Sequence, residues 1–332
     1  MPKLALYSVT YAGMWYDGPA LSIKEFIARA KRFGFPGVEL DCRAPHALPY
    51  LLKDRERKEI VEYLAKEGIV LAALAANNDF SSPVTEHRDA NIQMVVDMIR
   101  LCRDLGAPIL RVFTAWRGSS KRDGVGTYEV ARPGYDRAFP GTTFSERWQY
   151  CLECFRIVSK VAEEEGVILA LQNHPPVVRN SADVLTMIEE VGSPNFKTSF
   201  EISGERAWQD TDWVLSQARR IGDRWVHSHY GGDFRRSPDG TVVRFPLGLT
   251  MGPKDGNMSW NYDAWVQAMY DVNYQGYVAY EGCTPTYLPN GRLVPIEVMD
   301  ERVEMARDFM GQLFAKYEAV GREQKTAQAQ RE

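Results

Sequence analysis

The sequence has few of the features that mark membrane, nucleic-acid-binding or disulfide-rich proteins. No apolar stretch approaches the ~18–20 residues that a membrane-spanning helix needs, so no membrane association is expected. The formal net charge is −4 and no long run of Lys or Arg occurs, which argues against a nucleic-acid partner. The opening residues, MPKLALYSVTYAG, lack a cleavable signal pattern. These observations together predict a cytoplasmic protein.

Cysteine is also scarce, with five residues in a chain of 332. Their odd number and scattered positions do not form a disulfide framework. Cys151 and Cys154 make a C-x-x-C pair, but they lie within SERWQYCLECFRIVSKVAEEEG, which has helical periodicity. No second pair completes a zinc site. We therefore expect these two thiols to pack in a core.

Short β-rich runs alternate with longer amphipathic segments along the whole chain. Strands are expected at 4–9, 37–41, 70–76, 109–114, 167–173, 197–202, 224–229 and 277–282. Helices are expected at 22–34, 54–67, 88–105, 143–165, 181–191, 207–219, 260–272 and 299–318. This alternation predicts a (β/α)8 TIM barrel. A doubly wound sheet is disfavoured because YAGMWYDGP, rather than a glycine-rich phosphate-binding loop, follows the first strand.

The predicted barrel is a single domain covering residues 1–318. The polar segment 319–332 has no apolar stripe and is expected to be a disordered tail. Two loops are unusually long, at about 115–142 and 230–259, and they follow the fourth and seventh strands. Both belong to the C-terminal face of the barrel, where enzymes of this architecture place their active sites.

Strand side chains alternate between the barrel interior and the surrounding helices. The polar residues that this rule places inside, near the C-terminal face, are Gln172, His174, Glu201, His227, His229 and Glu281, with Trp225 on the same side as the two histidines. Each alone has an ordinary explanation, such as a strand-end amide, a surface carboxylate, a core histidine or half of an ion pair. Together, buried and unpaired, they would cost ~1–3 kcal/mol each. A bound divalent cation removes that cost, so the set predicts a metal site.

Five segments, taken in order, resemble the xylose-isomerase-like barrels, the sugar phosphate isomerase/epimerase superfamily, over roughly residues 4–316. They are GFPGVELD, LALQNHP, SPNFKTSFEI, WVHSHYGGDFRR and GYVAYEG. The resemblance implies a divalent cation, Mn²⁺ first with Mg²⁺ or Zn²⁺ as alternatives, held by Gln172, Glu201, His229 and Glu281. It also implies that Arg235, six residues after His229, binds substrate. Two ligands depart from the family pattern, because Gln172 stands in place of Glu and Glu201 in place of Asp.

The amide at Gln172 narrows the expected chemistry. In ketose epimerases of the superfamily, the glutamates of strands five and eight exchange a proton from opposite faces of the substrate, and an amide cannot do this. A one-base reaction is therefore favoured, with either His174 or Glu281 removing a proton next to a carbonyl. Glu39 and Arg111 are expected either to bind sugar hydroxyls or to pair with each other. His227 is expected to support the site from beneath.

Aromatic residues in the loops suggest a substrate with a flat or ring-shaped part, although they could equally form a packed lid or a subunit interface. They include Trp15, Trp116, Tyr128 and Trp260. One branch of the superfamily suits this picture, because the sequence resembles the larger subunit of bacterial C-glycoside deglycosidases. That resemblance implies a lyase that eliminates the aglycone of a 3-keto glycoside, with a small β-sandwich partner subunit. An oligomer is also expected.

The alternatives are a keto-sugar isomerase or 3-epimerase, and a non-catalytic sugar-binding barrel. Phosphodiester hydrolysis, as in DNA-repair endonucleases that share this barrel, is disfavoured because such enzymes need three metals. The chain has only five histidines to supply ligands.

Overall fold

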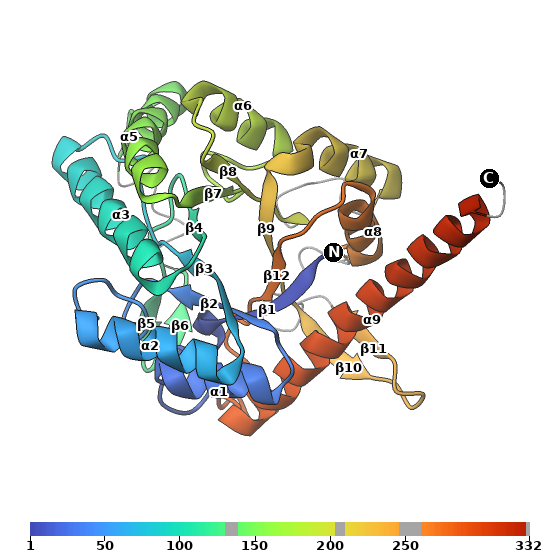
Figure 1. Ribbon diagram of the computed structural model, residues 1–332. Coiled ribbons are helices and arrows are strands. Elements are labelled where there is room, and N and C mark those ends of the chain that lie inside the picture. The colour runs from blue at the N-terminus through green and yellow to red at the C-terminus, as the bar shows by residue number, and fades with distance from the viewer. Residues whose placement is uncertain (130–138, 203–209, 246–259, 330–332) are drawn as a thin grey trace.

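The computed structural model describes residues 1–129, 139–202, 210–245 and 260–329. Eight parallel strands close into a barrel in the order β1-β12-β9-β8-β7-β4-β3-β2 (Figure 1). Their bounds are Lys3–Tyr7 (β1), Gly37–Asp41 (β2), Val70–Ala75 (β3), Ile109–Val112 (β4), Ile168–Gln172 (β7), Phe196–Ser199 (β8), Trp225–Tyr230 (β9) and Tyr277–Tyr280 (β12). The predicted (β/α)8 barrel is confirmed.

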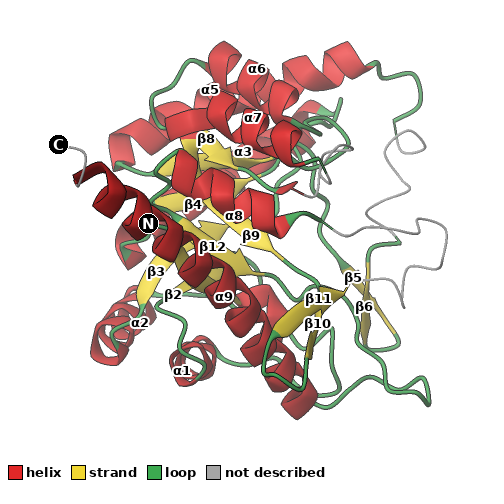
Figure 2. Cartoon of the chain, turned by 90° about the vertical axis from the view of Figure 1, so that its right-hand side faces the viewer, coloured by secondary structure: helices red, strands yellow, loops and turns green. Residues whose placement is uncertain are grey.

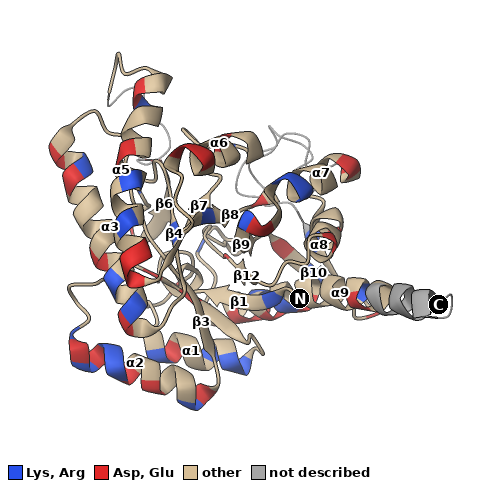
Figure 3. Ribbon diagram, turned by 45° about the horizontal axis from the view of Figure 1, so that its top comes forward, with Lys and Arg blue, Asp and Glu red and all other residues tan. Residues whose placement is uncertain are grey.

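Helices surround the barrel, and Figure 3 shows basic and acidic positions distributed along them. Their bounds are Ile23–Arg32 (α1), Asp54–Glu67 (α2), Thr85–Leu105 (α3), Phe144–Glu165 (α5), Ser181–Val191 (α6), Thr211–Ile221 (α7), Tyr262–Asp271 (α8) and Ile296–Ala329 (α9). Local sequence sets several of these ends. Thr143 caps α5 in a reciprocal capping box with Glu146, and Gly166 ends it at φ 69°. Within the described residues, no helix is both long and apolar enough to cross a bilayer.

The last helix is longer than the sequence pattern predicted. Its backbone continues to Ala329 and extends past the barrel (Figure 1), so the predicted boundary between 318 and 319 falls inside it. The extension is rich in Glu, Gln, Lys and Ala, which have high helix propensity. An apolar stripe serves packing and is not required for a helical backbone, so the disorder expected of residues 319–332 stays a prediction.

Each long loop after strands four and seven contains a β-hairpin that the sequence reading did not predict. Strands Ser120–Arg122 (β5) and Val125–Thr127 (β6) form the first, and Asp233–Arg236 (β10) and Val242–Phe245 (β11) form the second. Both lie at the C-terminal end of the barrel (Figure 2). The first hairpin packs closely on the preceding loops, since a Cβ at Gly126 would lie 2.3 Å from the Trp15 ring. Only glycine fits that approach.

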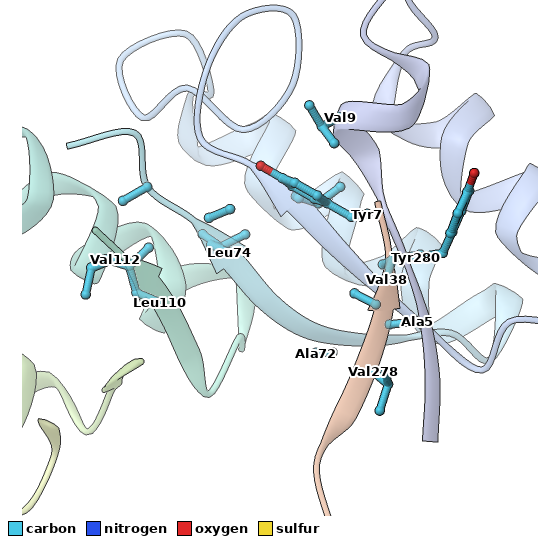
Figure 4. Close-up of a cluster of buried hydrophobic side chains, with 14 of the residues drawn as sticks. Ala5, Tyr7, Val9, Val38, Ala72, Leu74, Leu110, Val112, Val278 and Tyr280 are labelled. Carbon is cyan, nitrogen blue, oxygen red and sulfur yellow. The ribbon is translucent and has the colours of Figure 1, made fainter. Parts of the chain in front are cut away.

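The barrel interior is apolar at its N-terminal end and polar at its C-terminal end. Ala73, Ile109 and Ala170 form a small buried cluster inside, separate from the large core between the strands and helices. Figure 4 shows part of that larger core, with the Tyr7 and Tyr280 rings on opposite sides of the strands that carry them. Further along the strands, the interior carries charged side chains, and these lie at the functional site described below.

A β-bulge in β9 corrects one predicted orientation. Thr198 pairs with Trp225 and Ser199 with His227, so Val226 is an extra residue in β9. Trp225 therefore faces the helices, where its ring centroid lies 4.4 Å from that of Trp265. The prediction that Trp225 shares a side with the two histidines was wrong, because strict alternation does not hold across a bulge.

The cysteines are free, as expected, and four of the five are buried. Cys151 and Cys154 lie on the buried face of α5, and no disulfide joins any of the five. The C-x-x-C pair therefore belongs to the core.

Candidate metal centre and active site

A cavity of about 260 Å³ opens among the C-terminal ends of the strands. It brings together most of the residues predicted from the sequence, namely Arg111, Trp116, Gln172, His174, Glu201, His229 and Glu281. Three other predicted residues, Glu39, His227 and Arg235, are absent from the lining that the described residues form.

His229 lies at the centre of the site, and each of its ring nitrogens faces a carboxylate. Nδ1 lies 2.8 Å from Glu201 Oε1 and 3.5 Å from Glu281 Oε2, while Nε2 lies 2.5 Å from Glu39 Oε2. The ring stacks on Tyr7, with centroids 5.4 Å apart and planes 7° from parallel. The buried Nδ1 makes no hydrogen bond of acceptable angle to any described residue. Once deprotonated, Nδ1 could donate its electron pair to a cation held near these carboxylates.

These groups fit a divalent cation. Possible ligand atoms of Glu201, His229 and Glu281 lie within 4.8 Å of one another. The three residues come from the ends of β8, β9 and β12, and the His229 side chain is only 2% exposed. Carboxylate oxygens and an imidazole nitrogen, without thiolate, suit Mn²⁺ or Mg²⁺ and also permit Zn²⁺. The unmatched Nδ1, pointing at two carboxylates, is the observation that supports the fit.

Glu39 lies beneath His229, buried with no exposure to solvent. It accepts hydrogen bonds from Arg111 Nε at 2.8 Å and His227 Nε2 at 2.9 Å, in addition to its contact with His229. Burial tends to raise the pKa of Glu39, but His229, Arg111 and His227 together hold it well below its usual value. Of the two predicted alternatives, the structure therefore has Glu39 and Arg111 paired with each other. A carboxylate behind a histidine is the usual support for a metal ligand.

The pKa shifts of the clustered side chains are those expected of a site that binds positive charge. Burial alone lowers the pKa of His229, but Glu39 and Glu201 raise it to about 9. Burial raises the pKa of Glu281, and the charges of His229 and Arg111 oppose that rise. The net pKa shift of His227 is opposite to that of His229: burial lowers the pKa of His227 by more than Glu39 raises it. Without a metal, a proton on His229 supplies the positive charge that the surrounding carboxylates require.

Gln172 lies in the cavity wall with its side-chain oxygen directed at Arg111. Arg111 Nη1 donates to Gln172 Oε1, and the guanidinium lies 4.9 Å from the centroids of both Tyr7 and Phe113. An amide oxygen has two lone pairs, so this contact leaves one for another partner. Whether Gln172 completes a ligand set remains a prediction.

His174 also lines the cavity. Its ring packs edge-on against Trp116, with centroids 4.7 Å apart, and against Phe113 at 5.4 Å. Its Nδ1 lies 2.8 Å from the carbonyl oxygen of Pro175. The aromatic ring of Trp116 is thus part of the wall, as the sequence suggested.

Arg235 is placed elsewhere. It is an exposed residue of β10, and its neighbour Phe234 packs inwards against Tyr280 and Phe309. Because side chains alternate along a strand, burial of Phe234 directs Arg235 to the opposite side. The predicted role of Arg235 rested on its spacing of six residues from His229. Spacing alone does not show that a hairpin changes the direction of the chain between them.

Several cavity residues that belong to the first three strands were not predicted from the sequence. They are Tyr7, Asp41, Arg43 and Asn77, at or just after the ends of β1, β2 and β3. A signal was available, because GVELD ends in an acid and VLAALAA is followed by two asparagines. Applying the strand-end rule to the first three strands would have found Asp41 and Asn77.

A model of the xylose isomerase-like TIM barrel family matches residues 27–308. The chain belongs to this family. Among solved structures, D-psicose 3-epimerase in the presence of D-fructose aligns with a TM-score of 0.68 and 16% identity, covering 94% of this chain and 99% of the other. L-ribulose 3-epimerase aligns at 0.65 and 18%, covering 98% of each chain. The 3-keto-D-glucoside 4-epimerase YcjR from E. coli aligns at 0.62 and 15%, covering 92% and 99%.

At these identities the structural matches establish a shared barrel.

Proposed function

We propose that this xylose isomerase-like barrel is a divalent-metal-dependent enzyme that isomerises or epimerises a keto sugar. The observation that carries the proposal is the position of His229 Nδ1, between Glu201 and Glu281 on the wall of the cavity. The three aligned structures are all sugar epimerases, which supports the same class of reaction. They favour this reading over the lyase that the sequence suggested first.

Glu201, His229 and Glu281 would hold the cation, with Gln172 as a neutral fourth ligand. A divalent cation bound there supplies Lewis-acid stabilisation of the charge that develops on a carbonyl oxygen during proton removal. Glu39 orients His229 through Nε2 and is itself fixed by Arg111 and His227. Arg111 also holds the Gln172 amide oxygen.

Glu281 is the proposed base. Its side chain is 25% exposed and lines the cavity, so a substrate C–H can reach it. His174, from the end of β7, is the titratable side chain we assign to returning a proton on the opposite face of the sugar. Gln172 cannot perform that step because an amide is not basic at neutral pH.

Hydrogen exchange tests this proposal. Mn²⁺-loaded enzyme is incubated in D₂O with D-fructose, L-ribulose and a 3-keto glucoside, and the recovered sugars are examined by mass spectrometry and NMR. We expect deuterium next to the carbonyl and a new isomer or epimer. Glu281→Gln should abolish both, whereas Glu59→Gln on α2, at a partly exposed pair with Lys24 outside the cavity, should change neither. His174→Gln should block epimerisation yet leave deuterium exchange. An enzyme that binds no metal and exchanges no deuterium contradicts the proposal.

A C-glycoside lyase is a second candidate, favoured by two observations. The amide at Gln172 removes one of the two glutamates that two-base epimerisation uses. Trp116, Tyr128 and His174 also form an aromatic wall, with the rings of Trp116 and Tyr128 5.6 Å apart, against which a flat aglycone could lie. A small β-sandwich partner subunit belongs to this candidate. Release of the aglycone from a 3-keto C-glycoside, without an epimer in the recovered sugar, would decide for the lyase.

A further inference from the structure

The wall opposite the metal-ligand residues carries a second polar group, which we call the Asp41 array and define as Asp41, Arg43, Asn77, Trp116 and Ser119. We propose that the Asp41 array is a specificity site that binds adjacent hydroxyl groups of the sugar, on the part farthest from the reacting carbonyl. The proposal rests on the proposed function and adds the feature of the substrate that this cavity selects.

Hydrogen bonds hold the array in place. Asp41 accepts from Arg43 Nε at 2.5 Å and from Asn77 Nδ2 at 2.6 Å. Asn77 Oδ1 accepts from Trp116 Nε1 at 2.9 Å, and Arg43 Nη1 donates to Ser119 Oγ at 2.7 Å. The residues come from the ends of β2 and β3 and from the loop after β4. Side chains fixed in this way lose little conformational entropy when a ligand binds.

The array retains capacity for a ligand. A carboxylate offers about four acceptor positions and a guanidinium five donors. The contacts above occupy only part of these positions, and all five side chains line the cavity. A carboxylate beside a guanidinium and an amide presents an acceptor and donors side by side, which matches two neighbouring hydroxyl groups. The indole of Trp116 adds an apolar surface for the C–H face of a sugar.

Charge favours hydroxyl groups over a phosphate or carboxylate. Two arginines are found among the described residues that line the cavity, and each is paired with an acid: Arg43 with Asp41, and Arg111 with Glu39. An anionic substituent placed at the array would be repelled by the nearby Asp41 carboxylate, whose side chain is 1% exposed.

The array and the metal-ligand residues occupy different arcs of one cavity. The array belongs to the ends of β2 and β3 and the loop after β4, whereas Glu201 and Glu281 follow β8 and β12 and His229 lies near the end of β9. A short keto sugar that reaches the cation would leave the array unused, while a longer one can contact both. The Asp41 array therefore favours sugars that are long enough to reach it and that carry hydroxyl groups at that end.

Binding calorimetry on the Mn²⁺-loaded protein tests this inference without requiring turnover. Wild type, Asp41→Asn and Asn77→Ala are titrated with a ketohexose, a ketotetrose and the ketohexose 6-phosphate. Asp104→Asn serves as the matched control, because it alters another Asp–Arg pair, with Arg57, on the outer surface. Circular dichroism confirms that each variant is folded, and Asn77→Ala covers the case in which Asp41→Asn is not.

Loss of a hydrogen bond to a charged group is worth ~10–100-fold in affinity, so Asp41→Asn should weaken ketohexose binding by about that factor. Asn77→Ala should weaken it less, while both variants bind the ketotetrose as wild type does. Equal effects on the two sugars, or tighter binding of the phosphate, would overturn the proposal. Ketohexose binding that depends on Asp41, without deuterium exchange, would refute the proposed reaction and leave the array standing.

Discussion

Replacing Glu39 by Gln tests the idea that a buried carboxylate supports the metal centre from below. Glutamine has the same shape, so it leaves no cavity, but it removes the negative charge. In the native protein, that charge faces Arg111, His227 and His229 at 2.8, 2.9 and 2.5 Å. Since Glu39 and Arg111 are almost completely buried, solvent cannot replace the lost partner.

Two effects of different size follow from this geometry. Removing one member of a buried ion pair typically costs ~3–5 kcal/mol of stability. The cost should fall near the lower end, because Arg111 keeps Gln172 and the faces of Tyr7 and Phe113 as partners. Loss of the support behind a metal-binding histidine typically costs ~10–100-fold in metal affinity. We therefore expect a loss of about 3 kcal/mol and a Kd for Mn²⁺ at least tenfold higher.

Urea unfolding in the presence of a chelator measures the first effect, and calorimetric titration of the folded variant with Mn²⁺ measures the second. Asp104→Asn, at the partly exposed pair with Arg57, provides the comparison and should cost no more than about 1 kcal/mol. If Glu39→Gln lost less than about 1 kcal/mol and bound Mn²⁺ as tightly as wild type, the assigned role of Glu39 would be wrong.

Two further predictions concern His229 and Trp225. Because His229 has a pKa of about 9 without metal, Mn²⁺ must displace its proton at neutral pH, and the apparent affinity should rise ~10-fold per pH unit from 7 towards 9, as measured by calorimetry. In the metal-free protein, protonated His229 should contribute its full stabilisation below about pH 6.5 and lose it as the pH rises through 9. Urea unfolding across that pH range measures this change in the free energy of unfolding. A free energy that does not change with pH would contradict the pairing of His229 with Glu39. Trp225→Ala should cost ~3–5 kcal/mol, because the ring is 4% exposed and lies 4.4 Å from Trp265 and 4.9 Å from Tyr274; a loss below about 1 kcal/mol would place Trp225 outside the core.

The barrel itself could be predicted because its signals are local. Periodicity, a capping box such as Thr143 with Glu146, and a following glycine such as Gly166 act within a few residues of each helix end. Gln172, Glu201, His229 and Glu281 could be predicted as one set for a similar reason. Each lies at or near the end of a strand, where the alternation of side chains indicates which of them point into the barrel. These four residues do line one cavity.

The sequence could not indicate which partner each side chain has. Glu39 contacts His229 across 190 positions and Arg111 across 72, and only closure of the barrel brings them together. The bulge at Val226 depends on pairing with β8, and it turns Trp225 away from the histidines that follow it. The position of Arg235 depends on a hairpin that packs Phe234 against the barrel.

By itself, then, the sequence determined which elements form, their order and the face on which chemistry would take place, because helix and strand periodicity are properties of neighbouring residues. Only the tertiary structure decided that Glu39 supports His229 instead of facing the cavity, that Arg235 lies outside it and that Asp41, Arg43 and Asn77 form its opposite wall. These outcomes depend on distances between residues far apart in the chain, which are fixed only when the eight strands close.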